Sequence, residues 1–184
     1  MKTLHPELLL IFAVCACSKM PSSRSAASAT DLRISFEPAR DVAAIRFSGR
    51  DMSRPRIDVY GAFQPTQSDG TCWFKATECL HVMYPKDIKP EVSLSGKEEG
   101  KISENEVQSV MRFSETLKDV RQIDIVHGEN GAVGYVFSKD QVLRVVFKDN
   151  QTPKSDKINE HEAPTTKPRL NLVVPQGGGS PTFK

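Results

Sequence analysis

Apolar and polar residues alternate along most of the chain between residues 31 and 148, and this pattern predicts a β-sheet. Leu32, Ile34 and Phe36 alternate with polar neighbours, as in a strand that buries only one face. Gly49 ends a second apolar run of the same kind. We expect strands at residues 32–37, 42–49, 56–63 and 91–96, with two more between residues 70 and 84.

The segment from residue 120 to residue 148 predicts a β-meander. Three strand-like runs occupy residues 120–127, 132–138 and 141–148, and the short sequences "GENG" and "KD" separate them. Asn130-Gly131 in the first connection favours a tight turn with positive φ angles. Apolar residues alternate on one face of each of the last two runs: Val133, Tyr135 and Phe137, then Leu143, Val145 and Phe147.

The apolar period changes after residue 102, where we expect a helix. Ser103 and Glu106 have the spacing of a capping box, in which each side chain accepts a hydrogen bond from the other residue's free N–H. Residues at helical spacing follow: Val107, Val110, Met111, Ser114 and Leu117. This pattern predicts an amphipathic helix over residues 104–118 that packs on the sheet, with a partner-binding groove as the alternative. The expected fold class is α+β, an antiparallel sheet with a C-terminal β-meander and one main amphipathic helix.

Composition marks the expected ends of the folded domain, which we place at residues 31–148. Residues 18–30 are rich in Ser and Ala and predict a flexible tether. Residues 149–184 are rich in Pro, Gly and Thr and predict a largely disordered tail. Residues 169–174 are an island of β-character with three open interpretations: disorder, a strand added to the chain's own sheet, or a strand added to a partner's sheet.

The first 16 residues have the organisation of an export signal. Residues 8–14 form an apolar run that is too short to span a bilayer as a helix, which takes about 20 residues. Val14-Cys15-Ala16-Cys17 then resembles the lipobox of bacterial lipoproteins, in which an aliphatic residue, a small residue and Gly or Ala precede the modified cysteine. Cys15 is a less usual occupant of the second position.

The resemblance implies a lipid anchor on Cys17. In this family the signal, here residues 1–16, is removed, and the cysteine receives a diacylglycerol thioether and an acyl chain on its amine, which together anchor a protein stably. Residues 17–30 are then the lipidated cysteine and its tether. Ser18 replaces the Asp that retains enterobacterial lipoproteins in the inner membrane, which points to the outer membrane and a domain facing the periplasm. The alternative is plain secretion without a lipid. A metal site at Cys15 and Cys17 would need further ligands at suitable spacing, and a redox site would need the spacing C-x-x-C.

Cys72 and Cys79 remain after the signal is removed, and an oxidising periplasm favours a disulfide bond between them. One continuous strand would separate their Cα atoms by roughly 23 Å, whereas a disulfide needs less than about 7 Å. The bond therefore requires a chain reversal near residues 75–77 and predicts a stapled hairpin. Trp73 and Phe74 in this segment are the candidate partner-binding residues, because aromatic residues are enriched at binding hot spots. Burial in the core is the alternative for each.

Charge and motifs weigh against two classes of function. The net charge is +2, and the six arginines from Arg33 to Arg56 are interleaved with acidic residues such as Asp41 and Asp58. We expect a solvated sheet face of mixed charge there, and no nucleic-acid partner. No nucleotide-binding, metalloprotease or hydrolase motif occurs, so we expect no enzyme, no metal and no cofactor.

Three histidines keep minor alternatives open. His81 lies in a strand-like run, and His127 ends another strand before a turn. A catalytic triad of His127, Asp124 and a distant Ser remains possible in principle, since triads are spatial arrangements. His161 lies in the sequence "NEHE", which could chelate a metal weakly but is typical of a solvated charge run.

These observations predict an envelope lipoprotein that works by binding. Lipoproteins of this size and layout often inhibit or neutralise periplasmic enzymes, including as immunity proteins, or serve as accessory subunits of envelope complexes. The expected partners are the membrane, through the lipid, and an envelope protein. A carrier of an apolar small molecule held between sheet and helix, or an envelope enzyme without a recognisable motif, are the alternatives.

Overall fold

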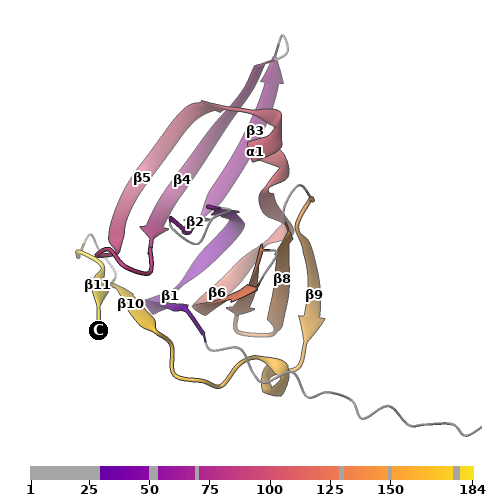
Figure 1. The fold of residues 1–184 in the computed structure, drawn as a ribbon. Helices are drawn as coiled ribbons and strands as arrows, with labels where there is room; N and C mark the ends of the chain where they lie inside the picture. Colours follow the sequence, from indigo (N-terminus) through magenta and orange to yellow (C-terminus); the bar gives the residue numbers. More distant parts are fainter. Residues whose placement is uncertain (1–29, 50–53, 69–70, 129–130, 149–150, 176–178) are drawn as a thin grey trace, which may run out of the picture.

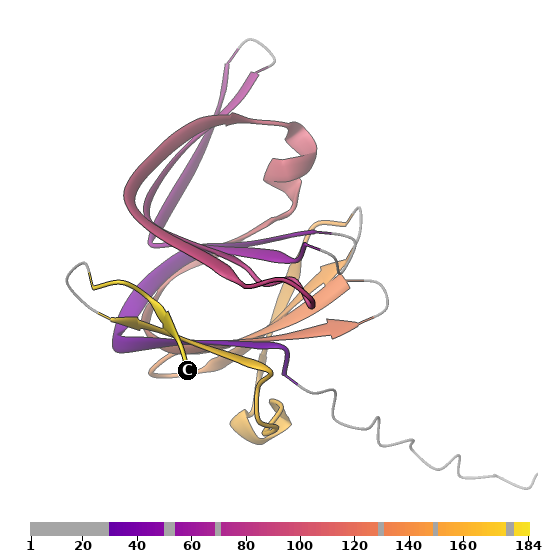
Figure 2. The ribbon, with the colours of Figure 1, turned by 60° about the vertical axis from the view of Figure 1, so that its left-hand side comes forward.

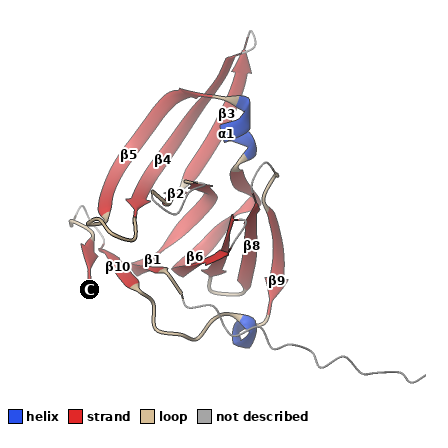
Figure 3. Cartoon of the chain, in the orientation of Figure 1, coloured by secondary structure: helices blue, strands red, loops and turns tan. Residues whose placement is uncertain are grey.

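Strands make up most of the computed structural model of this protein, which describes residues 30–49, 54–68, 71–128, 131–148, 151–175 and 179–184. The elements in chain order are β1 (Leu32–Ser48), β2 (Arg56–Tyr60), β3 (Ala62–Ser68), β4 (Thr71–Met83), β5 (Glu91–Ile102), α1 (Glu104–Gln108), β6 (Val110–Gly128), β7 (Gly131–Phe137), β8 (Val142–Lys148), β9 (Lys154–Ile158), the 3₁₀ turn η1 (Glu160–Glu162), β10 (Leu170–Pro175) and β11 (Thr182–Phe183). The two helical segments are short against the strands around them (Figure 3).

One sheet connects all the strands. Its main path is β3-β4-β2-β1-β6-β7-β8-β9, while β5 pairs with the other side of β4 and β10 pairs in parallel with the first half of β1. β3 and the parts of β4 and β5 that pair beside it, residues 71–77 and 97–102, extend beyond the rest of the sheet (Figure 1). We call these three segments the arm. β5 curves strongly along the arm and leads into α1 (Figure 2).

Two apolar clusters lie on opposite faces of β2. The main core draws on β1, β2, β4, β6, β7, β8 and β10, and its fully buried leucines and isoleucines are Leu32, Ile34, Ile45, Ile57, Leu80, Ile123, Ile125 and Leu172. The second cluster lines the inner face of the arm down to its base and consists of Ala44, Tyr60, Cys72, Phe74, Ala76, Cys79, Ile102 and Val110. Because both faces of β2 are covered, four of its five residues are buried.

The predicted fold class, α+β with a main amphipathic helix at residues 104–118, is wrong, because only Glu104–Gln108 are helical and β6 begins at Val110. The apolar spacing has another cause. Val110 belongs to the second cluster, whereas Met111 and Phe113 pack against the main core. A strand with an apolar cluster on each face carries apolar residues at adjacent positions, which imitates a helical period. The expected site of an apolar ligand beneath that helix is lost with it.

The predicted antiparallel sheet and its β-meander are confirmed. β6, β7 and β8 pair in antiparallel order from Gln122 to Lys148, and β6 and β7 stay paired up to Gly128 and Gly131. The expected strands at residues 32–37 and 42–49 are parts of the single long strand β1. On β7, Ala132 and Val136 face the main core. Val133, Tyr135 and Phe137 share the opposite face of the strand.

The C-terminal residues differ from the expected disordered tail. β9 pairs with β8, and β10 pairs with β1 from Leu32↔Leu170 to Glu37↔Pro175. Leu172 and Val174 are fully buried in the main core, so residues 169–174 add to the chain's own sheet, one of the three interpretations left open. The folded unit therefore extends past residue 148, to β11 at Thr182–Phe183.

The predicted signal, Cys17 and most of the tether lie outside the described residues, and the lipid anchor stays a prediction. Among the residues that the structure describes, no helix has the length and apolar character needed to cross a membrane.

Candidate functional site

Cys72 and Cys79 lie on the same strand, and both thiols are free and buried. β4 runs through both residues without reversing, paired with β3 at Cys72 and with β5 at Cys72 and Cys79. The predicted stapled hairpin and its disulfide are therefore not formed, since seven residues of strand hold the Cα atoms roughly 23 Å apart. Glu78 has a positive φ of 52°, and there the alternation of β4 shifts by one residue. This shift brings Cys79 to the same cluster as Cys72 and Ala76.

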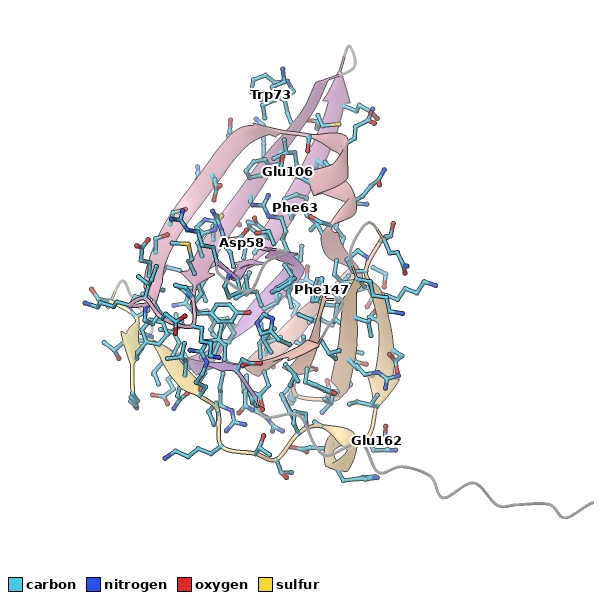
Figure 4. The ribbon with its side chains drawn as sticks, in the orientation of Figure 1. Asp58, Phe63, Trp73, Glu106, Phe147 and Glu162 are labelled. Atoms are coloured by element: carbon cyan, nitrogen blue, oxygen red, sulfur yellow. The ribbon has the colours of Figure 1, made fainter. Side chains whose placement is uncertain are left out.

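Trp73 and Phe74 point to opposite faces of β4. Phe74 is 7% exposed and stacks on Phe63 inside the arm, with 5.7 Å between ring centroids. Trp73 is 49% exposed and projects from the arm (Figure 4). The candidate pair is thus divided between core and surface, and only Trp73 remains available to a partner.

The outer face around Trp73 is polar. Its direct cross-strand neighbours are Thr66 on β3 and Lys101 on β5. Two residues further along β4, Lys75 forms an ion pair with Glu99 at 3.5 Å. An indole among charged and hydroxyl side chains is an isolated apolar contact on this three-stranded surface.

A row of charged side chains crosses the inner face at the base of the arm. Arg46 on β1 is the direct cross-strand neighbour of Asp58 on β2, and Asp58 is that of His81 on β4. All three side chains therefore lie on one face, and it is the face of the second cluster (Figure 4 labels Asp58). We call these residues, together with Arg56 and Glu98, the Asp58 network.

Asp58 is fully buried and accepts three charge-assisted hydrogen bonds. Arg46 Nε donates to Oδ2 at 2.9 Å, Arg56 Nε donates to Oδ1 at 2.6 Å, and His81 Nδ1 lies 2.7 Å from Oδ1. Burial alone would raise the pKa of Asp58, but the hydrogen bond from His81 and the two guanidinium groups outweigh it and lower the pKa. Asp58 is therefore a buried carboxylate that stays ionised because its partners are in place.

His81 bridges two carboxylates. Its Nδ1 faces Asp58 and its Nε2 lies 2.6 Å from Glu98 Oε2 on β5. The hydrogen bond to Asp58, with the charges of both carboxylates, raises the pKa of His81 although burial acts in the opposite direction. Arg46 also reaches Glu106 on α1, at 3.7 Å. Through this ion pair, α1 contacts the same group of charged side chains.

A thiol completes the group. Cys79 is fully buried, and its sulfur, a ring nitrogen of His81 and a carboxylate oxygen of Glu98 all lie within 4.8 Å of one another. Burial, together with the nearby charge of Glu98, raises the pKa of Cys79 to about 11. The thiol is therefore protonated at neutral pH as long as no cation is bound beside it.

The other two histidines of the described residues, His127 and His161, are not brought to this site. His127 Nε2 lies 2.9 Å from the hydroxyl of Tyr84, while Asp124 forms a paired ion bridge with Arg33. The triad of His127 and Asp124 is therefore not assembled. His161 lies exposed on η1.

Sequence reasoning placed Asp58 on a solvated face of mixed charge, and this was wrong, because Asp58 has no exposed area. The available signal was its position in the middle of the otherwise apolar run of β2, between Ile57 and Val59. An acidic residue there needs cationic partners on the same face, and these come from strands far apart in the sequence.

Comparisons with protein-family models, curated proteins and solved structures gave no match to this chain.

Proposed function

We propose that the protein is a cell-envelope lipoprotein that binds another envelope protein through the outer face of the arm. The observation that carries the proposal is the exposure of Trp73, which is 49% exposed on a projecting three-stranded surface. In the described part of the chain, Ile88 in the turn between β4 and β5 is the other large apolar side chain that is exposed.

Covering the exposed indole of Trp73 would stabilise a complex with a protein partner. A Trp side chain buries 150–250 Å² when fully covered, so a partner would cover about 100 Å² of further indole surface. At about 25 cal/mol per Å², this burial contributes roughly 2–3 kcal/mol, which is the scale of a binding hot spot. Lys75, Glu99 and Lys101 around the indole supply the polar rim that such interfaces have.

Site-specific photo-crosslinking in intact envelopes tests the proposal. A photoreactive residue at Thr66, directly opposite Trp73, is expected to crosslink one envelope protein, and Trp73→Ala in the same chain is expected to reduce that product at least tenfold. The matched control places the photoreactive residue at the exposed Lys157 on β9, at the far end of the sheet. Equal crosslinking from both positions, or a product at Thr66 that persists after Trp73→Ala, would refute the arm as the binding surface.

The anchor has its own test. Labelled fatty acid is expected to be incorporated into the native chain and lost in Cys17→Ala, with Cys15→Ala as the matched control that keeps the label. Incorporation that persists in Cys17→Ala would remove the lipid from this residue without bearing on the arm.

A further inference from the structure

We propose that Cys79, His81 and Glu98 form a binding site for a transition-metal ion of the Zn²⁺ type at the base of the arm. The three residues come from two adjacent strands, β4 and β5, and one ligand atom of each lies within 4.8 Å of the other two. Metal binding at this site is a property of the chain alone and does not depend on the proposed protein partner.

The three donors suit a borderline divalent ion. A thiolate, an imidazole nitrogen and a carboxylate oxygen are the ligand types of zinc, at about 2.0–2.3 Å from the ion. Two ligands of one tetrahedral ion are therefore roughly 3–4 Å apart. The donors in the structure are already close to that spacing, and His81 Nε2 and Glu98 Oε2, at 2.6 Å, hold between them a proton that an ion can replace.

One outer partner of His81 is of the kind that a metal-binding histidine needs. Its Nδ1 lies 2.7 Å from Asp58 Oδ1 and 2.9 Å from Arg56 Nη2, and the contact with Asp58 directs Nε2 toward Glu98. A carboxylate behind the non-ligating nitrogen is the usual means of fixing the tautomer and ring orientation of a zinc ligand. Asp58 is fixed in turn by Arg46 and Arg56, so the position of the ring is determined by the sheet itself.

The charge balance of the Asp58 network permits the exchange. The ion replaces the thiol proton of Cys79 and the Nε2 proton of His81, so one divalent charge enters and two protons leave. The buried carboxylate of Asp58 and its two arginines then meet the same total charge as before. No desolvated charge is left without a partner.

Access and reactivity also fit an ion. The side chain of Glu98 is 33% exposed and gives the site an opening to solvent, whereas Cys79 behind it is fully buried. With three protein ligands, one tetrahedral position is left for water or for a group from another molecule. Because β4 does not reverse between them, Cys72 is also too far away to form a disulfide with Cys79, so the thiol is available.

Cobalt(II) titration of the full chain carrying Cys15→Ser and Cys17→Ser tests the site without the N-terminal thiols. One Co²⁺ per chain is expected, with a thiolate-to-cobalt charge-transfer absorption that added Zn²⁺ removes. Cys79→Ser is expected to abolish this absorption. Cys72→Ser, which removes the other buried thiol of the same strand and cluster, is expected to keep it.

A second variant keeps the test decisive if Cys79→Ser does not fold. Glu98→Gln changes a partly exposed side chain on β5, leaves Asp58 paired with both arginines, and is expected to weaken Co²⁺ binding roughly tenfold or more. Absence of a thiolate band in the parent chain, a band that survives Cys79→Ser, or equal affinity in Glu98→Gln would each overturn the proposal, and the cluster would then be a structural ion network.

Discussion

The two faces of β2 show two different ways of burying a strand. Ile57 points into the main core among aliphatic side chains, while the next residue, Asp58, points into the second cluster and is buried just as completely. The second cluster contains small residues such as Ala44 and Ala76, which leave space for long charged side chains to converge. The free energy of burying an apolar side chain does not depend on the orientation of its contacts, whereas a buried carboxylate is tolerated only if each of its hydrogen-bond partners is in place.

The two faces of β2 therefore make different contributions to the protein: one face contributes to stability and the other carries the groups that can do chemistry. The main core buries large aliphatic side chains, each of which contributes through the area it removes from water. The face of the second cluster carries, besides its two thiols, an imidazole and three carboxylates among two guanidinium groups, and the hydrogen bonds of these groups require specific positions. The thiol of Cys79 and the Asp58 network thus lie on one side of β2, the side of the second cluster.

Asp58→Ala is the substitution expected to lower the free energy of unfolding most. It leaves Arg46 and His81 partly buried without their shared carboxylate, and loss of one partner of a buried ion pair costs about 3–5 kcal/mol. We expect a decrease of that size in the free energy of unfolding, measured by urea denaturation in the presence of a chelator. Amide hydrogen exchange is expected to rise first in β4 and β5 of the arm.

Ile57→Ala is the matched change on the other face of the same strand. It creates a cavity in the main core, for which about 3 kcal/mol is expected, and faster exchange is expected across the whole sheet rather than in the arm. Asp156→Ala removes the exposed ion pair with Arg144 and is expected to cost less than about 1 kcal/mol. A cost for Asp58→Ala as small as that of Asp156→Ala would show that the Asp58 network adds nothing to stability.

The two half-buried histidines, His81 and His127, differ in how their surroundings shift their pKa values, and the expected effect on stability is smaller. In contrast to His81, His127 lies beside the main core, where the hydroxyl of Tyr84 donates to Nε2 and burial lowers the pKa of His127 below its usual 6.5. The nearby charges are Asp31, which opposes this shift, and Arg169, which adds to it. The unfolded chain therefore binds a proton below pH 6.5 that the folded chain resists, so this group destabilises the fold as pH falls through 6.5 and has no effect well above it.

Urea denaturation of the native chain and of His127→Gln at several pH values measures this contribution. The difference in unfolding free energy between the two chains is expected to be constant above about pH 7.5 and to shift in favour of His127→Gln toward pH 5. A difference that does not change with pH would mean that His127 titrates alike in both states.

The sequence predicted the parts of the fold that depend on neighbours in the chain. The meander from residue 120 to residue 148 was predictable because short turns join strands that pair with each other. The start of β6 was not predictable, since its residues contact apolar clusters on both faces and lose the alternation that marks a strand. The two strands expected between residues 70 and 84 are the single strand β4, whose alternation shifts at Glu78. The Asp58 network was missed for a related reason: Arg46, Asp58 and Glu98 meet only once the register of four strands is set.

The capping box of Ser103 and Glu106 is a small feature of the fold that a single substitution can test. Glu106 N donates to Ser103 Oγ at 3.3 Å, and Glu106 Oε2 accepts from Ser103 N at 3.0 Å, so the predicted pair forms although the helix it begins has only five residues. Ser103→Ala is expected to lower the free energy of unfolding by about 1 kcal/mol or less. The effect is small because Glu106 keeps its ion pair with Arg46, and faster exchange is expected in α1 alone.

Ser114→Ala is the control that distinguishes the strand β6 from the helix expected at residues 104–118. On that helix Ser114 belonged to the apolar face, whereas in the structure it is exposed on β6. A change in stability within about 0.5 kcal/mol is therefore expected for Ser114→Ala. Stabilisation by Ser114→Ala together with a gain of helical circular dichroism would contradict β6, because Ala favours a helix and does not favour a strand.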